Sequence, residues 1–412
     1  MKRQPAGSAA TRQPARDLLL ASLDPNGESF AAHGATDWER IPWDWLLERA
    51  RHHKIAALFA GRMEQHGFLG LVPDHARAKL EQIRELAANR TTRAAQTLKI
   101  LCDLYGERSI PFLLVKGSVL AEQVYGDAHL RPFYDVDLVL HDEHMQQAEQ
   151  LLIDRGYYFF RPDFLLKHLT PLPHGGPGDA GEDLEGKLRR LMRERHHHVV
   201  LVLKEDDPRL PVELHWHITK PGVLRVDRAG IWEQATSTTV SGLAVKTLNL
   251  EAMLLHTAAH AMDQSPMEFK LLHLCDVVWI IERLGDRLRT GVLQKMITEW
   301  GAEQHLRCAL EAAAAIFPFR TPDADRFTGK RSRWEQGCLR LAGISHALID
   351  RGRPQTSSGR IVSRLFRETF WDLTFRRPPR RARESVSDYI AALSARLGKQ
   401  RTKDQTAVER DG

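Results

Sequence analysis

Two aspartates one residue apart, Asp135 and Asp137, are the residues whose types and spacing most directly suggest chemistry. They open a short apolar run that is typical of a buried strand, and alternate residues of a strand point to the same face. The two carboxylates can therefore share one metal ion or bracket two. Mg²⁺ suits carboxylate and phosphate oxygens together, so the pair predicts a metal–nucleotide site, with Mn²⁺ as the alternative ion.

A third carboxylate, Glu213, comes from a second predicted strand over residues 212–218. Strict alternation there puts Glu213, His215 and His217 on one face and apolar side chains on the other. Three carboxylates and two metal ions allow an in-line displacement at the α-phosphorus of a nucleotide. We expect Glu213 to bind metal and activate the attacking hydroxyl, and His215 to contact the nucleobase or the acceptor, because imidazole hydrogen-bonds either way.

The tripeptide Lys116-Gly117-Ser118 lies between an apolar run and a helical stretch. Glycine permits close backbone approach, and backbone N–H groups with a hydroxyl can hold phosphate oxygens. We therefore predict Gly117 and Ser118 as phosphate ligands. Lys116 and Arg131 are predicted to balance the charge of the polyphosphate. The alternative is that these two cations are solvated or paired with Asp127.

Several histidines near these acids raise a second metal hypothesis. Residues 196–198 are all histidine, and His215 and His217 are spaced so that both could ligate one zinc ion. The neighbouring acids favour Mg²⁺ instead. His256 and His260 are one helical turn apart but lack the glutamate of a metalloprotease motif, so they are predicted to form a packed helix face.

The elements that must position these residues follow from hydrophobic periodicity. Helical patterns fill residues 41–106 and 249–375, and short buried strands alternate with helices over residues 107–248. We predict an α+β fold, with a small mixed β-sheet and flanking helices between N-terminal and C-terminal helical regions. Residues 1–40 are predicted to be disordered or loosely ordered, and residues 376–412 to form a basic tail.

Composition excludes several classes of protein. The chain has 412 residues, 42% of them hydrophobic and 27% charged, which is typical of a folded globular protein. The cysteines are scattered without paired spacing, which favours a reducing compartment. No apolar run approaches the roughly 20 residues of a membrane span, and no signal-peptide core follows the basic N-terminus. We therefore expect a cytoplasmic protein without a membrane span.

The net charge and the composition of residues 171–186 each allow more than one interpretation. The net charge of +6 favours acidic partners such as nucleotides, and the basic tail permits nucleic acid without requiring it. Residues 171–186 are rich in Pro, Gly and Asp, which indicates either a mobile lid or a disordered segment.

The order of these motifs resembles the nucleotidyltransferase superfamily related to DNA polymerase β, which carries Gly-Ser, then Asp-x-Asp on the next strand, then a later acid. The match is closer to an uncharacterised bacterial nucleotidyltransferase family and covers roughly residues 43–300. Tyr134 is a departure, since Ser or Gly often precedes the first aspartate. The residues that carry the resemblance are Lys116-Gly117, Leu120, Tyr125, Arg131, Asp135-Val136-Asp137, Glu213-Leu214-His215-Trp216, His256, His260 and Asp276.

The resemblance implies an enzyme that moves an NMP group from a nucleoside triphosphate to a hydroxyl-type acceptor and releases pyrophosphate. It also implies a small molecule or peptide as the acceptor. Two alternatives stay open. One is a catalytically silent nucleotide-binding or scaffold protein that recruits a partner enzyme, and the other is a toxin-like nucleotidyltransferase that modifies tRNA or protein.

Overall fold

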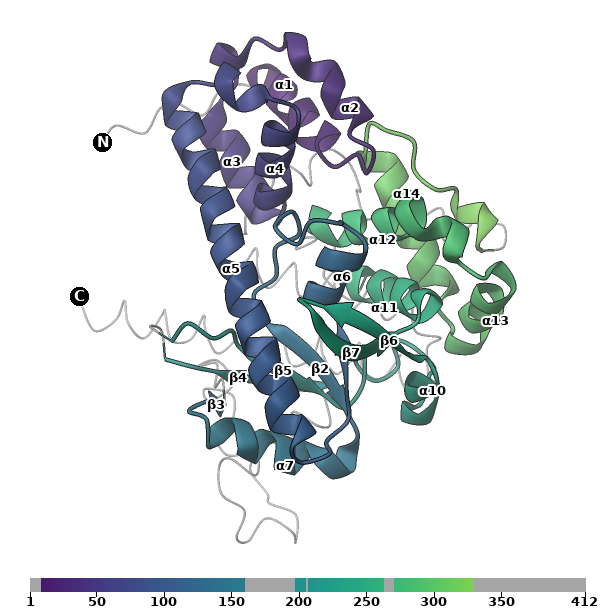
Figure 1. Ribbon diagram of the computed structural model, residues 1–412. Helices are drawn as coiled ribbons and strands as arrows, with labels where there is room; N and C mark the ends of the chain where they lie inside the picture. Colours follow the sequence, from purple (N-terminus) through teal and green to yellow (C-terminus); the bar gives the residue numbers. More distant parts are fainter. Residues whose placement is uncertain (1–8, 160–196, 205–206, 263–269, 329–412) are drawn as a thin grey trace, which may run out of the picture. The chain divides into compact units, whose positions relative to one another are not determined.

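The computed structural model describes residues 9–159, 197–204, 207–262 and 270–328 (Figure 1). All of them belong to the first of two compact units into which the chain divides, Met1–Arg353. Three parts named above lie outside the described residues: residues 171–186, which the sequence left open as a lid or a disordered segment, His196, and the basic tail.

A five-stranded mixed sheet lies at the centre of the described residues. Its middle strands are short and apolar, and β2 is buried along its whole length. Strands β2 and β5 are parallel, and the other neighbouring pairs are antiparallel. The order across the sheet is β1 (Phe112–Val115), β2 (Val136–Leu140), β5 (Val212–His215), β4 (His198–Val202) and β3 (Tyr158–Phe159).

A separate hairpin of β6 (Ala235–Val240) and β7 (Leu243–Leu248) packs beside β1. Its two-residue turn has φ values of 51° at Ser241 and 76° at Gly242, and two positive values are typical of the tight turns that suit the twist of a hairpin. The sequence interpretation did not include this hairpin, although a Ser-Gly pair is a turn signal.

Helices surround the sheet. In Figure 1, α5 runs across the sheet, and it contacts β2. The helices that precede β1 are α1 (Ala9–Ala21), α2 (Glu28–Ala31), α3 (Trp43–His52), α4 (Ala56–Gln65) and α5 (Asp74–Gly106), with 3₁₀ turns η1 (Ala32–Ala35), η2 (Trp38–Arg40) and η3 (Phe68–Leu71).

The structure differs from the prediction of a disordered or loosely ordered N-terminus over residues 9–40, the described part of that segment. Helix α1 forms there, and its Leu18, Leu19 and Leu20 are buried. Phe30 packs edge-on against Phe59 of α4, with their ring centroids 6.1 Å apart. The apolar side chains of this segment are too few to predict order by themselves, but they become buried when packed against later helices.

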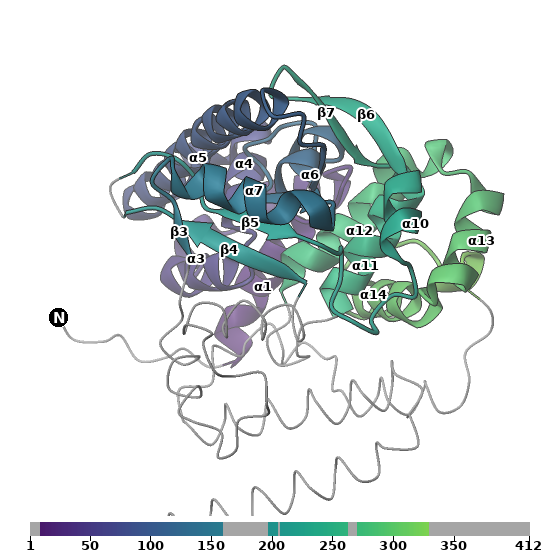
Figure 2. The ribbon, with the colours of Figure 1, turned by 90° about the horizontal axis from the view of Figure 1, so that it is seen from below.

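The helices that follow the sheet gather on one side of it in both views (Figures 1 and 2). Helix α11 packs against both α12 and α14, and almost every residue of α11 is buried. The helices among and after the strands are α6 (Gly117–Gln123), α7 (Asp142–Ile153), α10 (Arg228–Glu233), α11 (Leu250–Met262), α12 (Leu271–Leu284), α13 (Thr290–Trp300) and α14 (Glu303–Ile316), with η4 (Gly285–Arg287) and η5 (Ala324–Arg326).

The predicted α+β class is confirmed: a small mixed sheet lies between helical regions. One strand is shorter than predicted, because β5 ends at His215 instead of continuing to residue 218. Past that point the chain bends, and His217 bonds to nearby backbone. Among the described residues, no helix combines the length and the apolar character that crossing a membrane requires.

Candidate active site

The register of neighbouring strands brings the predicted acids together. In the parallel pair of β2 and β5, Asp137 lies opposite Glu213. Asp137 also lies opposite Val115, the last residue of β1, so Lys116 follows at the same end of the sheet. Asp135 comes just before β2 begins. We refer to Asp135, Asp137 and Glu213 as the carboxylate cluster.

Two nitrogen groups contact the same oxygen of Asp137, whose side chain is 4% exposed. Lys116 Nζ donates to Oδ1 over 2.6 Å, and His215 Nε2 lies 2.9 Å from that atom. Burial alone would raise the pKa of Asp137, but the Lys116 ammonium and the His215 imidazole outweigh burial and hold the pKa well below its usual value. Asp137 is therefore a carboxylate.

Glu213 shares both of these nitrogen neighbours. Its Oε2 lies 3.3 Å from His215 Nε2 and 3.9 Å from Lys116 Nζ. His198 Nε2, on β4, is 3.8 Å from the same oxygen. The Lys116 ammonium is thus a cation close to both of these carboxylates.

The pKa of Asp135 is raised at this site. Burial, followed by the negative charges of Asp137 and Glu213, raises its pKa to about 7, although Lys116 and Lys54 act in the opposite direction. Burial and the two neighbouring acids together therefore disfavour the ionised form of Asp135. One more cation would favour the ionised form of Asp135.

The donor set fits a divalent cation. The ligand atoms of Asp137, Glu213 and His215 lie within 4.8 Å of one another. Asp135 precedes Asp137 by two residues. Two carboxylates suit Mg²⁺, and the imidazole extends the choice to Mn²⁺. The Lys116 ammonium already lies beside these oxygens, as a monovalent stand-in for such an ion.

The turn between β1 and α6 has an unusual backbone. Lys116 has φ 56° and ψ −119°, in a region that residues other than glycine rarely adopt. A Cβ at Gly117 would lie 2.8 Å from Cβ of Phe133, so close packing requires this glycine. Ser118 is buried in the first turn of α6. The phosphate contacts of Gly117 and Ser118 stay predictions.

Arg131 is buried, and its guanidinium donates to acceptors of the protein itself. Its Nε and one terminal nitrogen donate to the two carboxylate oxygens of Asp276, both over 2.8 Å, and its other terminal nitrogen donates to the Gly117 carbonyl over 3.2 Å. The Tyr125 hydroxyl donates to Asp276 as well, over 2.8 Å. Arg131 was predicted to balance polyphosphate charge, but these contacts make it an anchor between α12 and the Lys116-Gly117 turn.

Three of the histidines near the carboxylate cluster lie together, and His217 lies apart from them. His197, His198 and His215 lie near one another, and one nitrogen from each lies within 4.8 Å of the others. Burial, followed by the nearby His215 and His198, lowers the pKa of His197 far below its usual value, so this imidazole is neutral. His217 belongs to neither metal-competent group of described residues, because its Nε2 donates to the Val226 carbonyl over 2.8 Å. The arrangement of His215 and His217 about one zinc ion, which the sequence analysis set aside in favour of Mg²⁺, is therefore not formed.

The predicted packed helix face on α11 is confirmed for His256, which is buried. Burial lowers the pKa of His256 to about 3, with Lys116 the next largest cause, so it is neutral. His260 stacks edge-on against His273 of α12, with their ring centroids 4.9 Å apart. Both His256 and His260 therefore pack within the helical layer of α11 and α12.

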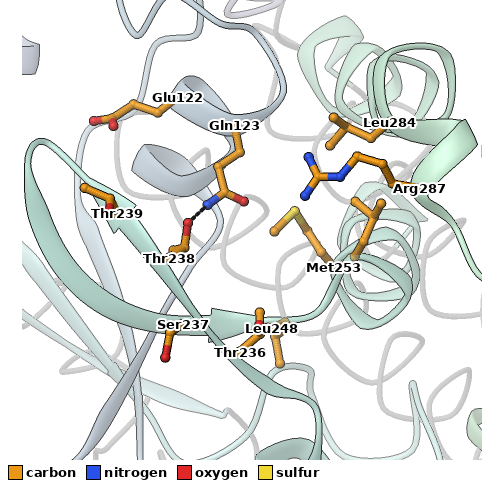
Figure 3. A pocket seen from close by; sticks show the side chains of 11 residues that line it. Glu122, Gln123, Thr236, Ser237, Thr238, Thr239, Leu248, Met253, Leu284 and Arg287 are labelled. Carbon is orange, nitrogen blue, oxygen red and sulfur yellow. Dashed lines mark hydrogen bonds between the residues drawn. The ribbon is translucent and has the colours of Figure 1, made fainter.

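A pocket of about 430 Å³ lies elsewhere in the described part of the chain (Figure 3). Gln123 of α6, Thr238 of β6, Met253 of α11 and Arg287 of η4 contribute to its lining, and Gln123 donates to the Thr238 hydroxyl. No residue of the carboxylate cluster lines this pocket. It is separate from the site described above.

Comparison with known proteins gives one strong match. A family model described as "Uncharacterised nucleotidyltransferase" matches residues 39–318. No curated protein matches the sequence.

Two solved structures of one enzyme resemble the chain weakly. A solution structure of the antibiotic-resistance factor ANT(2″)-Ia is 14% identical, with 50% of this chain and 90% of that chain covered and a TM-score of 0.30. A crystal structure of ANT(2″)-Ia in complex with adenylyl-2″-tobramycin is 13% identical, with 48% and 93% covered and a TM-score of 0.29. These scores are too low to transfer any property to this chain.

Proposed function

Because the chain belongs to the uncharacterised nucleotidyltransferase family and is a transferase, we propose that it moves an NMP group from a nucleoside triphosphate to an acceptor hydroxyl. One observation carries this proposal. The parallel register of β2 and β5 pairs Asp137 with Glu213, and a cationic side chain, Lys116, lies close to both carboxylates.

We assign Asp135, Asp137 and Glu213 as the residues that hold a divalent cation, Mg²⁺ or Mn²⁺. When bound, such a cation supplies charge to the phosphate oxygens and lowers the pKa of the attacking hydroxyl. The raised pKa of Asp135, about 7, supports the assignment, because a cation would favour its ionised form. His215 holds Asp137 and Glu213 in place through Nε2, at 2.9 Å and 3.3 Å.

The proposed reaction is a displacement at the α-phosphorus. The acceptor oxygen forms a bond to the α-phosphorus and gives its proton to the Glu213 carboxylate. The bond between the α-phosphorus and the bridging oxygen breaks, and pyrophosphate leaves with that oxygen. Glu213 suits the role of base because its side chain is 17% exposed, more than that of Asp137 at 4%, so an acceptor can reach it.

The acceptor is proposed to be a small molecule or a peptide with a hydroxyl group. Incubation with each nucleoside triphosphate labelled at the α-phosphate, Mg²⁺ and a cell extract would identify it as the molecule that becomes labelled. Labelling in proportion to pyrophosphate release supports the proposal. Pyrophosphate release without a labelled product other than NMP would make the chain a hydrolase and contradict it.

One observation favours the alternative of a silent nucleotide-binding protein. Lys116 and His215 already satisfy Asp137 without any added cation. A silent protein would bind nucleotide equally well with and without Mg²⁺ and would release no pyrophosphate. The raised pKa of Asp135 speaks against it, because burial and the charges of Asp137 and Glu213 together outweigh the effect of Lys116.

A further inference from the structure

The charges available to a polyphosphate differ from those that the sequence suggests. Lys116 is paired with Asp137 over 2.6 Å, and Arg131 is paired with Asp276 over 2.8 Å. Both predicted phosphate cations are therefore committed to carboxylates of the protein. A triphosphate is polyanionic, so a site that receives it needs additional positive groups.

Two further cations lie beside Tyr134, the residue that precedes Asp135. The guanidinium carbon of Arg90, on α5, is 4.2 Å from the Tyr134 ring centroid, and Lys54 Nζ, between α3 and α4, is 5.8 Å from it. Tyr134 is 48% exposed. Within the described ranges, neither cation forms a salt bridge with a carboxylate. Cations held against an exposed ring keep their charge available to a ligand.

Lys54 is also close to the carboxylate cluster. Its charge acts on Asp135 and lowers the pKa of that group, against the effects of burial and of the other acids. The N-terminal helical region thus contributes positive charge at the edge of the site where Asp135 lies.

The backbone at Lys54 points to a use for its side chain. Lys54 follows the end of α3 with φ 59°, a left-handed conformation in which glycine is favoured. Lys54 N–H donates to the Arg51 carbonyl over 3.1 Å, and Ile55 N–H donates to the Ala50 carbonyl over 2.8 Å. A strained non-glycine residue beside an active site is a reason to look for function.

Ser109 provides a matched position far along the chain. It follows α5 with φ 53°, its N–H donates to the Gly106 carbonyl over 3.1 Å, and the next N–H, of Ile110, donates to the Tyr105 carbonyl over 2.9 Å. The two helix ends therefore have the same hydrogen bonds and the same strain. They differ in that Lys54 contacts the Tyr134 ring.

We propose that Lys54 and Arg90 bind the polyphosphate of the nucleoside triphosphate, with Tyr134 holding both cations beside Asp135. This inference rests on the proposed function, since it names the residues that receive the same substrate. The ligands of this pair are nucleoside triphosphates and inorganic tripolyphosphate. A nucleoside monophosphate lacks the β- and γ-phosphates, so its binding should depend little on Lys54 and Arg90.

The test compares Lys54→Gly, Arg90→Gln and the control Ser109→Gly in the full chain. Calorimetric titration with tripolyphosphate, an NTP and the matching NMP, each with Ca²⁺ to limit turnover, measures affinity. We expect Kd for tripolyphosphate and NTP to rise about tenfold or more in Lys54→Gly and Arg90→Gln, because a charge-assisted contact is lost. Kd for NMP should change little.

Stability separates loss of a ligand contact from loss of structure. Since glycine relieves the left-handed strain, Lys54→Gly and Ser109→Gly should each keep or raise the Tm. Ser109→Gly should bind NTP as the wild type does. A variant that folds at least as well but binds triphosphate more weakly has lost a ligand contact.

The outcomes distinguish this inference from the proposed function. Wild-type affinity for tripolyphosphate and NTP in both Lys54→Gly and Arg90→Gln would overturn the inference, while NMP transfer by the wild type would still support the function. Conversely, weakened triphosphate binding in the variants, with no NMP transfer by the wild type, would keep the binding site and reject the function. A wild type that binds no triphosphate would overturn both.

Discussion

Asp137 and Glu213 face each other across the parallel strands β2 and β5, and the Lys116 ammonium lies 2.6 Å from the first and 3.9 Å from the second. The sheet therefore holds two like charges together before any substrate arrives. Lys116 offsets part of their repulsion. This arrangement makes the site depend on cations.

Replacement of Lys116 by methionine should increase that dependence. The variant keeps the length of the side chain but leaves the carboxylate cluster without its internal cation. We expect a lower Tm than wild type in the absence of divalent ions, and a larger rise in Tm when Mg²⁺ or Mn²⁺ is added. Thermal melts with and without EDTA, together with Mn²⁺ binding measured by electron paramagnetic resonance, would check this. Equal responses of the two proteins would refute the role given to Lys116.

Asp276 is expected to act on catalysis through Arg131. Asp276→Asn breaks a buried two-point ion pair and leaves a guanidinium without its counter-charge, which costs about 3–5 kcal/mol of unfolding free energy. Because Arg131 also holds the Gly117 carbonyl, kcat should fall more than KM rises. Urea denaturation and steady-state kinetics on the same preparation would measure both effects.

Tyr125→Phe should weaken the same buried cluster less than Asp276→Asn does. It removes one hydrogen bond to Asp276 and keeps the stacking of the ring on Trp279, whose centroid is 4.3 Å away. We expect a loss of about 1 kcal/mol of unfolding free energy and a small fall in kcat. If Tyr125→Phe and Asp276→Asn lowered stability but left kcat intact, Arg131 and its partners would be structural only.

Stability should fall on mild acidification because of His305, which is buried on α14. Burial lowers the pKa of His305 from its usual 6.5 to about 4. The unfolded chain therefore takes up this proton first, so the contribution of His305 is fully present above pH 6.5 and is lost as the pH falls toward 4. The loss is about 3 kcal/mol at most.

His305→Gln isolates this effect from that of the other titrating groups. The difference in unfolding free energy between wild type and His305→Gln should shift in favour of the variant between pH 6.5 and pH 4. Chemical denaturation at several pH values would measure it. A constant difference across that range would mean that His305 does not titrate abnormally.

The part of the site that the sequence predicts best is local. Val136–Leu140 is a strand, as predicted from the short apolar run that begins at the two aspartates. The α+β class followed from the same kind of reasoning. Alternation also identified Glu213 and His215 on one face, although the strand ends at His215 and not at residue 218.

The parts that the sequence could not predict are contacts between distant segments. Arg131 and Asp276 lie far apart in the chain, and nothing near either residue indicates an ion pair. Nothing in the sequence around Lys54 distinguishes it from an ordinary surface lysine. Its contact with the Tyr134 ring forms only in the folded chain. Order over residues 9–40 likewise depends on later helices, since Trp279 of α12 donates to the Leu23 carbonyl over 2.8 Å.

The most direct test of nucleotidyl transfer compares wild type with Asp137→Asn in one assay. Each protein is incubated with an NTP labelled at the α-phosphate, Mg²⁺ and a cell extract, and both labelled acceptor and released pyrophosphate are counted. We expect the wild type to form them in equal amounts, and Asp137→Asn to lose roughly a hundredfold or more of this rate while circular dichroism shows a folded protein. Nucleotide binding without pyrophosphate release by the wild type, or normal turnover by Asp137→Asn, would contradict the proposal.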